Sequence, residues 1–154
     1  MQFGILGSLL VCDGETMVPV AGARQRLLLA TLILRAGQPV PAETLAEIVW
    51  DGAPPAGAVT TLRSHVMRLR RVLGPLAGVR LVTRSPGYLL EAAEDEVDVL
   101  QFAALCRAGG AAASSAAWQE ASGLLEHALG LWRGTPLADV PSDVLHRAEA
   151  PRQP

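Results

Sequence analysis

The stretch of residues 60 to 74, TTLRSHVMRLRRVLG, constrains the fold most, because it combines dense positive charge with apolar residues at helical spacing. At 3.6 residues per turn these apolar side chains share one face, which predicts a helix over residues 58–73 that buries this stripe in a core. The stripe consists of Val59, Leu62, Val66, Leu69 and Leu73. The far side carries Thr60, Thr61, Ser64, Arg68 and Arg71, with Arg63, His65 and Arg70 on its flanks.

Hydroxyls and guanidinium groups without a carboxylate suit contact with an anionic groove. The alternative for this face is a merely solvated surface. Arg63 and Arg70 lie close to the apolar stripe, so they have a second option, which is to pack their stems and pair with Glu43, Glu47 or Asp51. For His65 a hydrogen bond within its own domain and a phosphate contact both remain open.

The charge is divided unevenly along the chain. Residues 1–90 carry nine arginines against five acids, whereas residues 91–154 carry four arginines against ten acids. Residues 58–84 contain six arginines and no acid at all. Every basic residue is Arg, so the arginine count by itself says little, but the absence of interleaved acids predicts a local positive field.

Composition and motifs exclude several classes of protein. No apolar run reaches membrane-spanning length, and the start of the chain lacks the features of a signal peptide, so we expect a soluble, cytoplasmic protein. Cys12 and Cys106 stand alone, which indicates neither a metal site nor a disulfide framework. Because no nucleophile with its base and no phosphate-binding glycine motif is present, we expect no enzyme activity and no cofactor.

The remaining elements of the first half follow from turn and cap signals. Residues 1–20 have short apolar runs broken by Gly7 and Asp13-Gly14, which predicts two or three strands in a small antiparallel sheet. A helix is expected at about residues 22–36, and a second from Pro41 to just before Gly52. Alternating apolar residues around Ser85-Pro86-Gly87 predict a hairpin; they are Val79, Leu81, Tyr88 and Leu90.

A short sheet, three helices and a hairpin form a winged helix-turn-helix, an α+β fold whose third helix enters the major groove of DNA. Arg84 would then lie at the tip of the hairpin wing, where it could enter a narrow minor groove. Its alternative is a solvated hairpin charge. We expect this DNA-binding domain to span residues 1–92.

Residues 97–107 and 117–132 also show helical spacing, with the small-residue stretch AGGAAASS between them as a linker. The two helices are expected to pack as a hairpin, with Trp118 and Trp132 as core anchors. The acidic run of residues 91–98 is most simply a solvated connection. Its alternative is a patch that keeps the second half away from DNA phosphates by repulsion.

The sequence also resembles a known family. The segments TLRSHVMRLRRVLG and LVTRSPGYLL are similar to the recognition helix and wing of OmpR- and PhoB-type winged helices. The longer run LAEIVWDGAPPAGAVTTLRSHVMRLRRVLG resembles the SARP group, the Streptomyces antibiotic regulatory proteins, and LWRGTPLADV resembles part of the bacterial transcriptional activation domain that follows the DNA reader in that group. That domain is a longer array of helices, of which residues 97–154 would supply only the start.

The resemblance implies a sequence-specific DNA-binding transcription activator that recruits RNA polymerase at direct repeats near secondary-metabolite genes. It also implies that the protein can bind DNA as a dimer. The residues that it places at DNA are Thr60, Thr61, Arg63, Ser64, His65, Arg68, Arg70, Arg71 and Arg84. Arg68 is expected to read bases, and Arg63 is a second candidate for this role. The alternative function is an interaction module that binds protein or RNA without reading a DNA sequence.

The loop WDGAPPAG between the second and third helices is stiffened by Pro54 and Pro55 and is too apolar to bind phosphate. In related winged helices the matching loop faces RNA polymerase. The resemblance therefore implies a polymerase contact at Asp51, Ala53 and Ala56. The alternative is a loop that only fixes the angle between two helices.

Overall fold

A computed structural model describes residues 1–140 of the chain. It opens with the expected small sheet, in which β1 (Gln2–Gly4), β2 (Leu10–Asp13) and β3 (Thr16–Met17) pair antiparallel in that order. Gly14 makes the turn between β2 and β3 at a φ of 62°, a conformation that glycine adopts without strain. The prediction of a short antiparallel sheet is therefore confirmed.

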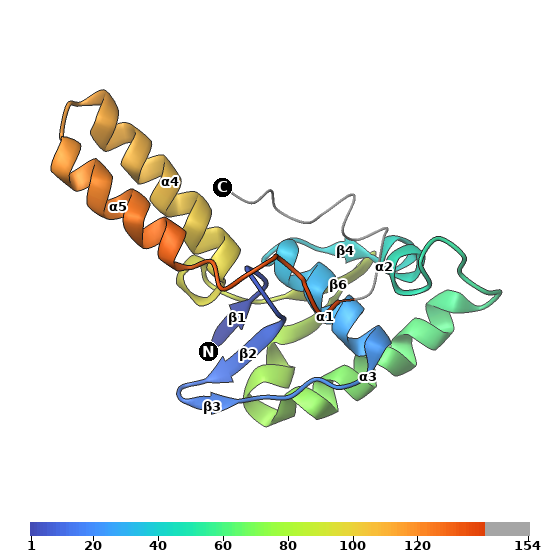
Figure 1. The fold of residues 1–154 in the computed structure, drawn as a ribbon. Helices are drawn as coiled ribbons and strands as arrows, with labels where there is room; N and C mark the ends of the chain where they lie inside the picture. The colour runs from blue at the N-terminus through green and yellow to red at the C-terminus, as the bar shows by residue number, and fades with distance from the viewer. Residues whose placement is uncertain (141–154) are drawn as a thin grey trace.

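Three helices follow, at nearly the expected places. They are α1 (Ala23–Leu34), α2 (Ala42–Val49) and α3 (Ala58–Ala77). Helix α1 is buried along most of its length, since Leu28, Leu29, Leu32 and Ile33 have no exposed surface. The two other helices pack against it and close the core around these side chains (Figure 1).

Helix α3 buries four of the five stripe residues that the sequence predicts. Leu62, Val66, Leu69 and Leu73 are at most 4% exposed, but Val59 is 43% exposed and Ala58 is buried instead. The stripe therefore begins one residue earlier than expected. Gly74 has φ 81° and ψ −179°, which breaks the helical course just before Pro75, so the stop expected at Gly74-Pro75 is present as a sharp kink.

The hairpin wing consists of β5 (Leu81–Arg84) and β6 (Gly87–Leu90), with Leu81 opposite Leu90 and Arg84 opposite Gly87. The short strand β4 (Val40–Pro41) pairs with the other edge of β6. A Cβ at Gly87 would lie 1.9 Å from the carbonyl oxygen of Val40, so only glycine allows this pairing. Val79 was expected in the hairpin but lies in the 3₁₀ turn η1 (Gly78–Arg80) and is exposed.

The second half forms a helical hairpin of α4 (Asp98–Ser114) and α5 (Trp118–Gly130), which projects away from the rest of the molecule (Figure 1). The expected linker at residues 108–115 is wrong, because α4 runs through it to Ser114. Its small residues serve close packing instead: a Cβ at Gly109 would lie 2.8 Å from Cδ2 of Leu125. Alanine also favours helix more strongly than any other residue.

The two tryptophans differ from the expectation for a pair of core anchors. Trp118 begins α5 at the tip of the hairpin and is 66% exposed, so its prediction is wrong. Trp132 lies partly buried at the base of the hairpin, where its ring meets the edge of Phe102 with centroids 5.3 Å apart. Helical spacing alone does not bury a side chain. A second element must also cover it, and at the tip of the hairpin Trp118 remains 66% exposed.

After α5 the chain returns to the N-terminal sheet. The backbone N–H groups of Arg133 and Leu137 donate to the carbonyl oxygens of Leu6 and Ile5, at 2.7 and 3.1 Å. Asp139 accepts a bond from the N–H of Leu9 and forms an ion pair with Arg26 at the start of α1. Leu137 and Val140 are buried in the main core, so the segment LWRGTPLADV fastens the hairpin to the first half.

Asp98, the first residue of α4, makes the second fastening. Its carboxylate accepts hydrogen bonds from the N–H groups of Ile5 and Leu6 at 2.9 to 3.0 Å. A parallel bridge between Phe3 and Val97 lies beside it. The helical segment expected to reach residue 154 lies outside the described residues from 141 onward. Within residues 1–140, no helix has the length and apolar character needed to cross a bilayer.

Candidate nucleic-acid interface

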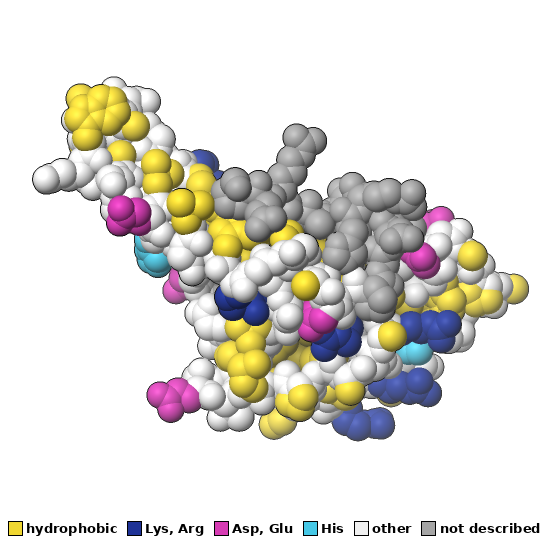
Figure 2. Space-filling view, viewed as in Figure 1, with side chains coloured by type: hydrophobic (Ala, Val, Ile, Leu, Met, Phe, Trp, Pro, Cys, Tyr) yellow, Lys and Arg dark blue, Asp and Glu magenta, His cyan; other side chains and the backbone are white. Residues whose placement is uncertain are grey.

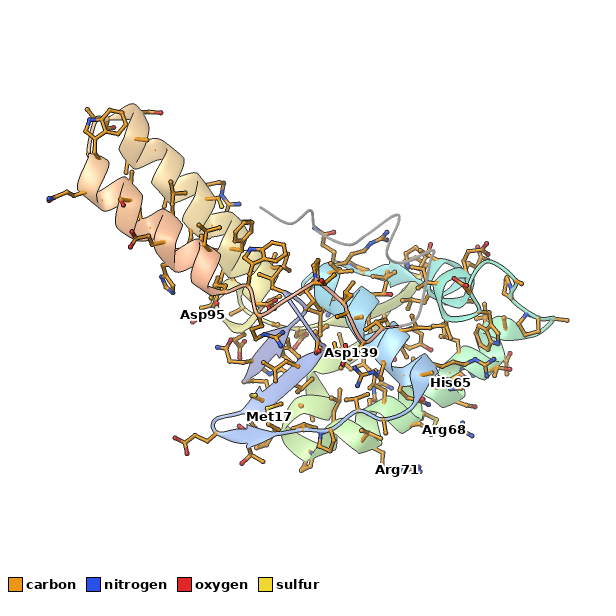
Figure 3. The ribbon with its side chains drawn as sticks, in the orientation of Figure 1. Met17, His65, Arg68, Arg71, Asp95 and Asp139 are labelled. Atoms are coloured by element: carbon orange, nitrogen blue, oxygen red, sulfur yellow. The ribbon has the colours of Figure 1, made fainter. Side chains whose placement is uncertain are left out.

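The outer face of α3 presents the side chains that the sequence analysis assigned to DNA. Figure 2 shows basic side chains gathered beside a histidine at one end of the molecule, and Figure 3 labels His65, Arg68 and Arg71 there along α3. The exposed members of the predicted set on this helix are Thr60, Thr61, Arg63, Ser64, Arg68 and Arg71. Helical periodicity thus separates a core face from a polar, positive face, as the sequence predicts.

His65 differs from the other predicted contacts because it is only 7% exposed. Its Nδ1 lies 3.2 Å from Nε2 of Gln25 in α1, and its ring meets the edge of Trp50. Burial, followed by the charges of Arg24 and Arg68, lowers the pKa of His65 below 6.5, so the neutral ring is favoured. Two roles were left open for His65. The structure shows the contact with a residue of its own domain, Gln25, and contact with a DNA phosphate stays a prediction.

Arg70 bonds to the wing rather than to acids of α2. Its Nε donates to the carbonyl oxygen of Leu81 at 2.8 Å, and its Nη2 donates to Oγ1 of Thr83 at 3.0 Å. The alternative left open for Arg70, a pair with Glu43, Glu47 or Asp51, is therefore replaced by bonds to the wing. The bonds to β5 fix the position of the wing relative to α3.

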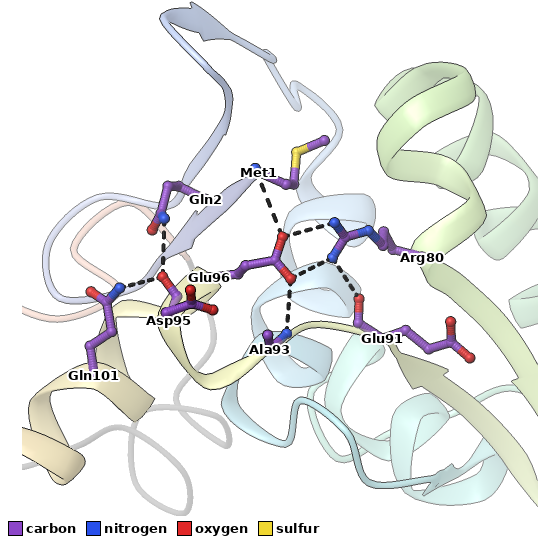
Figure 4. A network of polar contacts seen from close by, with 8 residues as sticks. All are labelled: Met1, Gln2, Arg80, Glu91, Ala93, Asp95, Glu96 and Gln101. Atoms are coloured by element: carbon purple, nitrogen blue, oxygen red, sulfur yellow. Dashed lines mark hydrogen bonds and ion pairs between the residues drawn. The ribbon is translucent and has the colours of Figure 1, made fainter.

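Arg80, the fifth arginine of the acid-free stretch, has a structural role that charge counting missed. Its guanidinium forms a bidentate pair with Glu96, with N–O distances of 2.7 and 2.8 Å, in the network of Figure 4. The bond from Arg80, and then the N–H of Ala93, lower the pKa of Glu96 to about 2. Glu96 and Asp98 are thus structural residues, and the acidic run is more than a solvated connection.

Arg84 ends β5 at the tip of the wing, and its side chain is 57% exposed. Its Nη2 lies 3.8 Å from a carboxylate oxygen of Glu91, which is also exposed. An exposed ion pair at this distance contributes at most about 1 kcal/mol, because solvent screens it. Such a pair leaves the guanidinium free to exchange Glu91 for another anion.

Arg24 is a basic residue of this face that the sequence analysis missed. It belongs to the first turn of α1, and its guanidinium carbon lies 5.3 Å from the ring centroid of Trp50. It is close enough to His65 to lower that residue's pKa, as is Arg68. The one feature of the sequence that pointed to Arg24 was the basic cluster ARQR at the start of the first helix. Helical periodicity alone cannot show that this cluster lies beside α3.

The loop between α2 and α3 extends at one end of the molecule, beside α3 (Figure 1). Asp51, Ala53 and Ala56 are all exposed in it, together with both prolines. Asp51, Gly52 and Gly57 have positive φ values of 52°, 88° and 73°. The loop therefore follows a tightly specified path and presents its side chains outward.

Together these features define a class of protein: a winged helix-turn-helix whose third helix carries exposed arginines on its outer face and whose wing carries an exposed arginine at its tip. The comparisons with known proteins agree. Residues 20–90 match the family described as "Transcriptional regulatory protein, C terminal", and residues 97–153 match the "Bacterial transcriptional activator domain".

Three curated relatives carry both regions. The chain is 35% identical to transcriptional regulatory protein EmbR of Mycobacterium tuberculosis, 39% to regulatory protein AfsR of Streptomyces coelicolor and 34% to regulatory protein DnrI of Streptomyces peucetius. Each match covers 91 or 92% of this chain, but only 37%, 14% and 54% of the respective relative. The chain thus spans about half or less of the length of these proteins.

One solved structure extends the match to three dimensions. Mycobacterium tuberculosis EmbR, in complex with a low-affinity phosphopeptide, superposes with a TM-score of 0.82 at 35% identity, over 90% of this chain and 38% of that one. The chain belongs to the SARP family of transcriptional regulators, whose members are not enzymes. The resemblance found in the sequence and the α+β winged-helix fold are both confirmed.

Proposed function

We propose that this chain binds double-stranded promoter DNA in a sequence-specific manner and activates transcription. The observation that carries the proposal is the one-sided distribution of charge on α3, where exposed hydroxyls and arginines lie opposite a buried stripe. Helix α3 would dock in the major groove, with Arg68 and Arg63 at base edges. Arg84 would reach the adjacent minor groove from the wing.

The other predicted contacts divide by geometry. Thr60, Thr61, Ser64 and Arg71 are exposed and suited to phosphate oxygens, which set the register of the helix. At least two N–H donors of Arg70 bond to β5, so we propose that its main role is to fix the position of the wing. His65 is assigned the same supporting role, since its ring is buried against Trp50.

Salt dependence tests this function most simply. If three or four phosphates are neutralised per protomer, the logarithm of the binding constant should fall with the logarithm of salt concentration at a slope of roughly −3 to −4. Fluorescence anisotropy with a promoter fragment and with a scrambled duplex measures this slope and the sequence preference together. A flat titration removes the DNA proposal. Equal binding to both duplexes, to RNA or to an acidic protein favours the alternative interaction module.

Activation requires a second contact, which we place on RNA polymerase at the exposed loop between α2 and α3. By resemblance the targets would be secondary-metabolite promoters with direct repeats, occupied by two copies of the protein. Asp51 lies close to the arginines of α1 and α3, so Ala53 and Ala56 are the cleaner positions for a test. Ala53→Asp with Ala56→Asp should spare DNA affinity and lower activated transcription. If both quantities stay unchanged, the loop only sets a helix angle.

A further inference from the structure

A hollow of about 440 Å³ lies between the first turn of α1 and the middle of α3. Two arginines line it from different elements, Arg24 from α1 and Arg68 from α3, and His65 lies in its wall. Both arginines are exposed, whereas His65 is buried. The hollow therefore opens to solvent beside the outer face of α3.

The position of Arg24 is fixed by an aromatic contact. Its guanidinium lies over Trp50, a residue held at the core by the end of α2. Stacking occupies the face of a guanidinium and leaves the N–H donors at its edge available, in the planar arrangement that matches two oxygens of a phosphate. The contact also removes rotamer freedom from Arg24 before any ligand arrives, which lowers the entropic cost of binding.

The hollow is lined by two arginines, by Asp51 and by a histidine whose pKa is lowered. Gln25 Nε2 lies 3.2 Å from Nδ1 of His65, and burial, followed by the charges of Arg24 and Arg68, lowers the pKa of the His65 ring. Arg24 and Arg68 repel each other across this space. One anion between them would convert the repulsion into two attractions, whereas Asp51, which also lines the hollow, limits how many further negative charges it accepts.

We propose that this hollow binds one phosphate of the DNA backbone, with Arg24 as the contact residue and Trp50 as its positioning residue. The inference rests on the proposed function and adds helix α1 to the DNA interface. A backbone phosphate fits better than a base edge, because Arg24 belongs to α1 and flanks α3, the element expected to enter the groove. The contact would tie the docking angle of α3 to the body of the domain.

The test compares Arg24→Ala with Arg107→Ala, which removes the same charge from an exposed site on α4. Arg24→Ala should lower affinity by on the order of three- to tenfold on promoter and scrambled duplex alike, and should reduce the salt slope by about 0.9. Arg107→Ala should leave both quantities unchanged. Thermal melting of each variant checks that the fold is retained.

A second pair of variants tests the positioning role. Trp50→Phe keeps an aromatic face for the guanidinium and should retain most of the affinity, whereas Arg24→Lys keeps the charge but loses the planar donors and should fall between wild type and Arg24→Ala. If the wild type binds with a steep salt slope and Arg24→Ala matches it in affinity and slope, this inference is overturned while the proposed function stands. If the wild type shows no salt-dependent binding, the proposed function itself fails.

Discussion

The two halves of the molecule are held together in different ways. Among residues 1–140 most of the large, fully buried side chains lie within residues 3–90, for example Phe3, Leu29, Leu32 and Leu62, and none lies in α4 or α5. In α4 and α5 the buried residues are small or polar: Asp98, Gly109, Ala112, Ala121 and Ala128. None of the larger apolar residues of α5 is fully buried: Leu125 is 40% and Leu129 54% exposed.

This difference indicates which interactions stabilise the fold of each half. The winged-helix half is determined by a closed core, in which each large side chain has a place. The hairpin depends on helix propensity, on one seam of small residues between α4 and α5, and on the fastenings at its base. We therefore expect the hairpin to open locally at lower free energy than the rest.

Leucine truncation in each half should give the largest contrast. Leu32→Ala removes a side chain with no exposed surface and should lower the free energy of unfolding by about 2 to 5 kcal/mol. Leu129→Ala on α5 should change it by no more than about 0.5 kcal/mol, because that side chain already faces water. Chemical denaturation of both variants measures the contrast; comparable losses would mean that Leu129 is covered in solution.

Asp98→Ala should detach the helical hairpin without unfolding the winged-helix half. The change leaves the N–H groups of Ile5 and Leu6 without their acceptor, at a cost of about 1 to 3 kcal/mol. Hydrogen exchange should rise in β1, α4 and α5 and remain slow in α1. Asp139→Ala is the matched variant at the other fastening. Uniform loss of protection across the chain would contradict a division between two regions.

The pair between Arg80 and Glu96 should give a smaller effect that depends on pH. The folded-state pKa of Glu96, about 2, lies below its ordinary value of 4.5, so its contribution to stability is complete above about pH 4.5 and is lost as the pH falls toward 2. Glu96→Gln should flatten the stability curve in that window and leave neutral-pH DNA affinity unchanged. Melting temperatures between pH 2 and 6 check this; parallel curves for both proteins would exclude the role.

The same difference explains what the sequence could predict. Periodicity and turn signals located the sheet, the three helices and the wing, because in a closed core each apolar stripe has a partner. In the helical hairpin the same reasoning predicted the two helices and their packing, but not that Trp118 is exposed or that Gly109 lies inside a helix.

Within the candidate site, spacing along α3 found Arg68 and Arg71 but could not show that Arg70 bonds to β5. Nor could it bring Arg24 beside His65, since they meet only through tertiary packing. The fastenings at Asp98 and Asp139 were missed for the same reason. Each is a contact between residues more than 90 positions apart.

The central claim is that the outward face of α3 reads DNA. A comparison of the alanine variants of Arg68 and Arg71 tests this claim most directly. Arg68→Ala should lose about 1 to 3 kcal/mol of binding free energy at the cognate site and relax the preference at one base pair. Arg71→Ala should weaken all sequences equally and lower the salt slope by about 1. Affinities of both variants for the cognate duplex and for single-base substitutions decide the matter. If both keep full affinity and preference, α3 is not the reader and its charge is only a solvated surface.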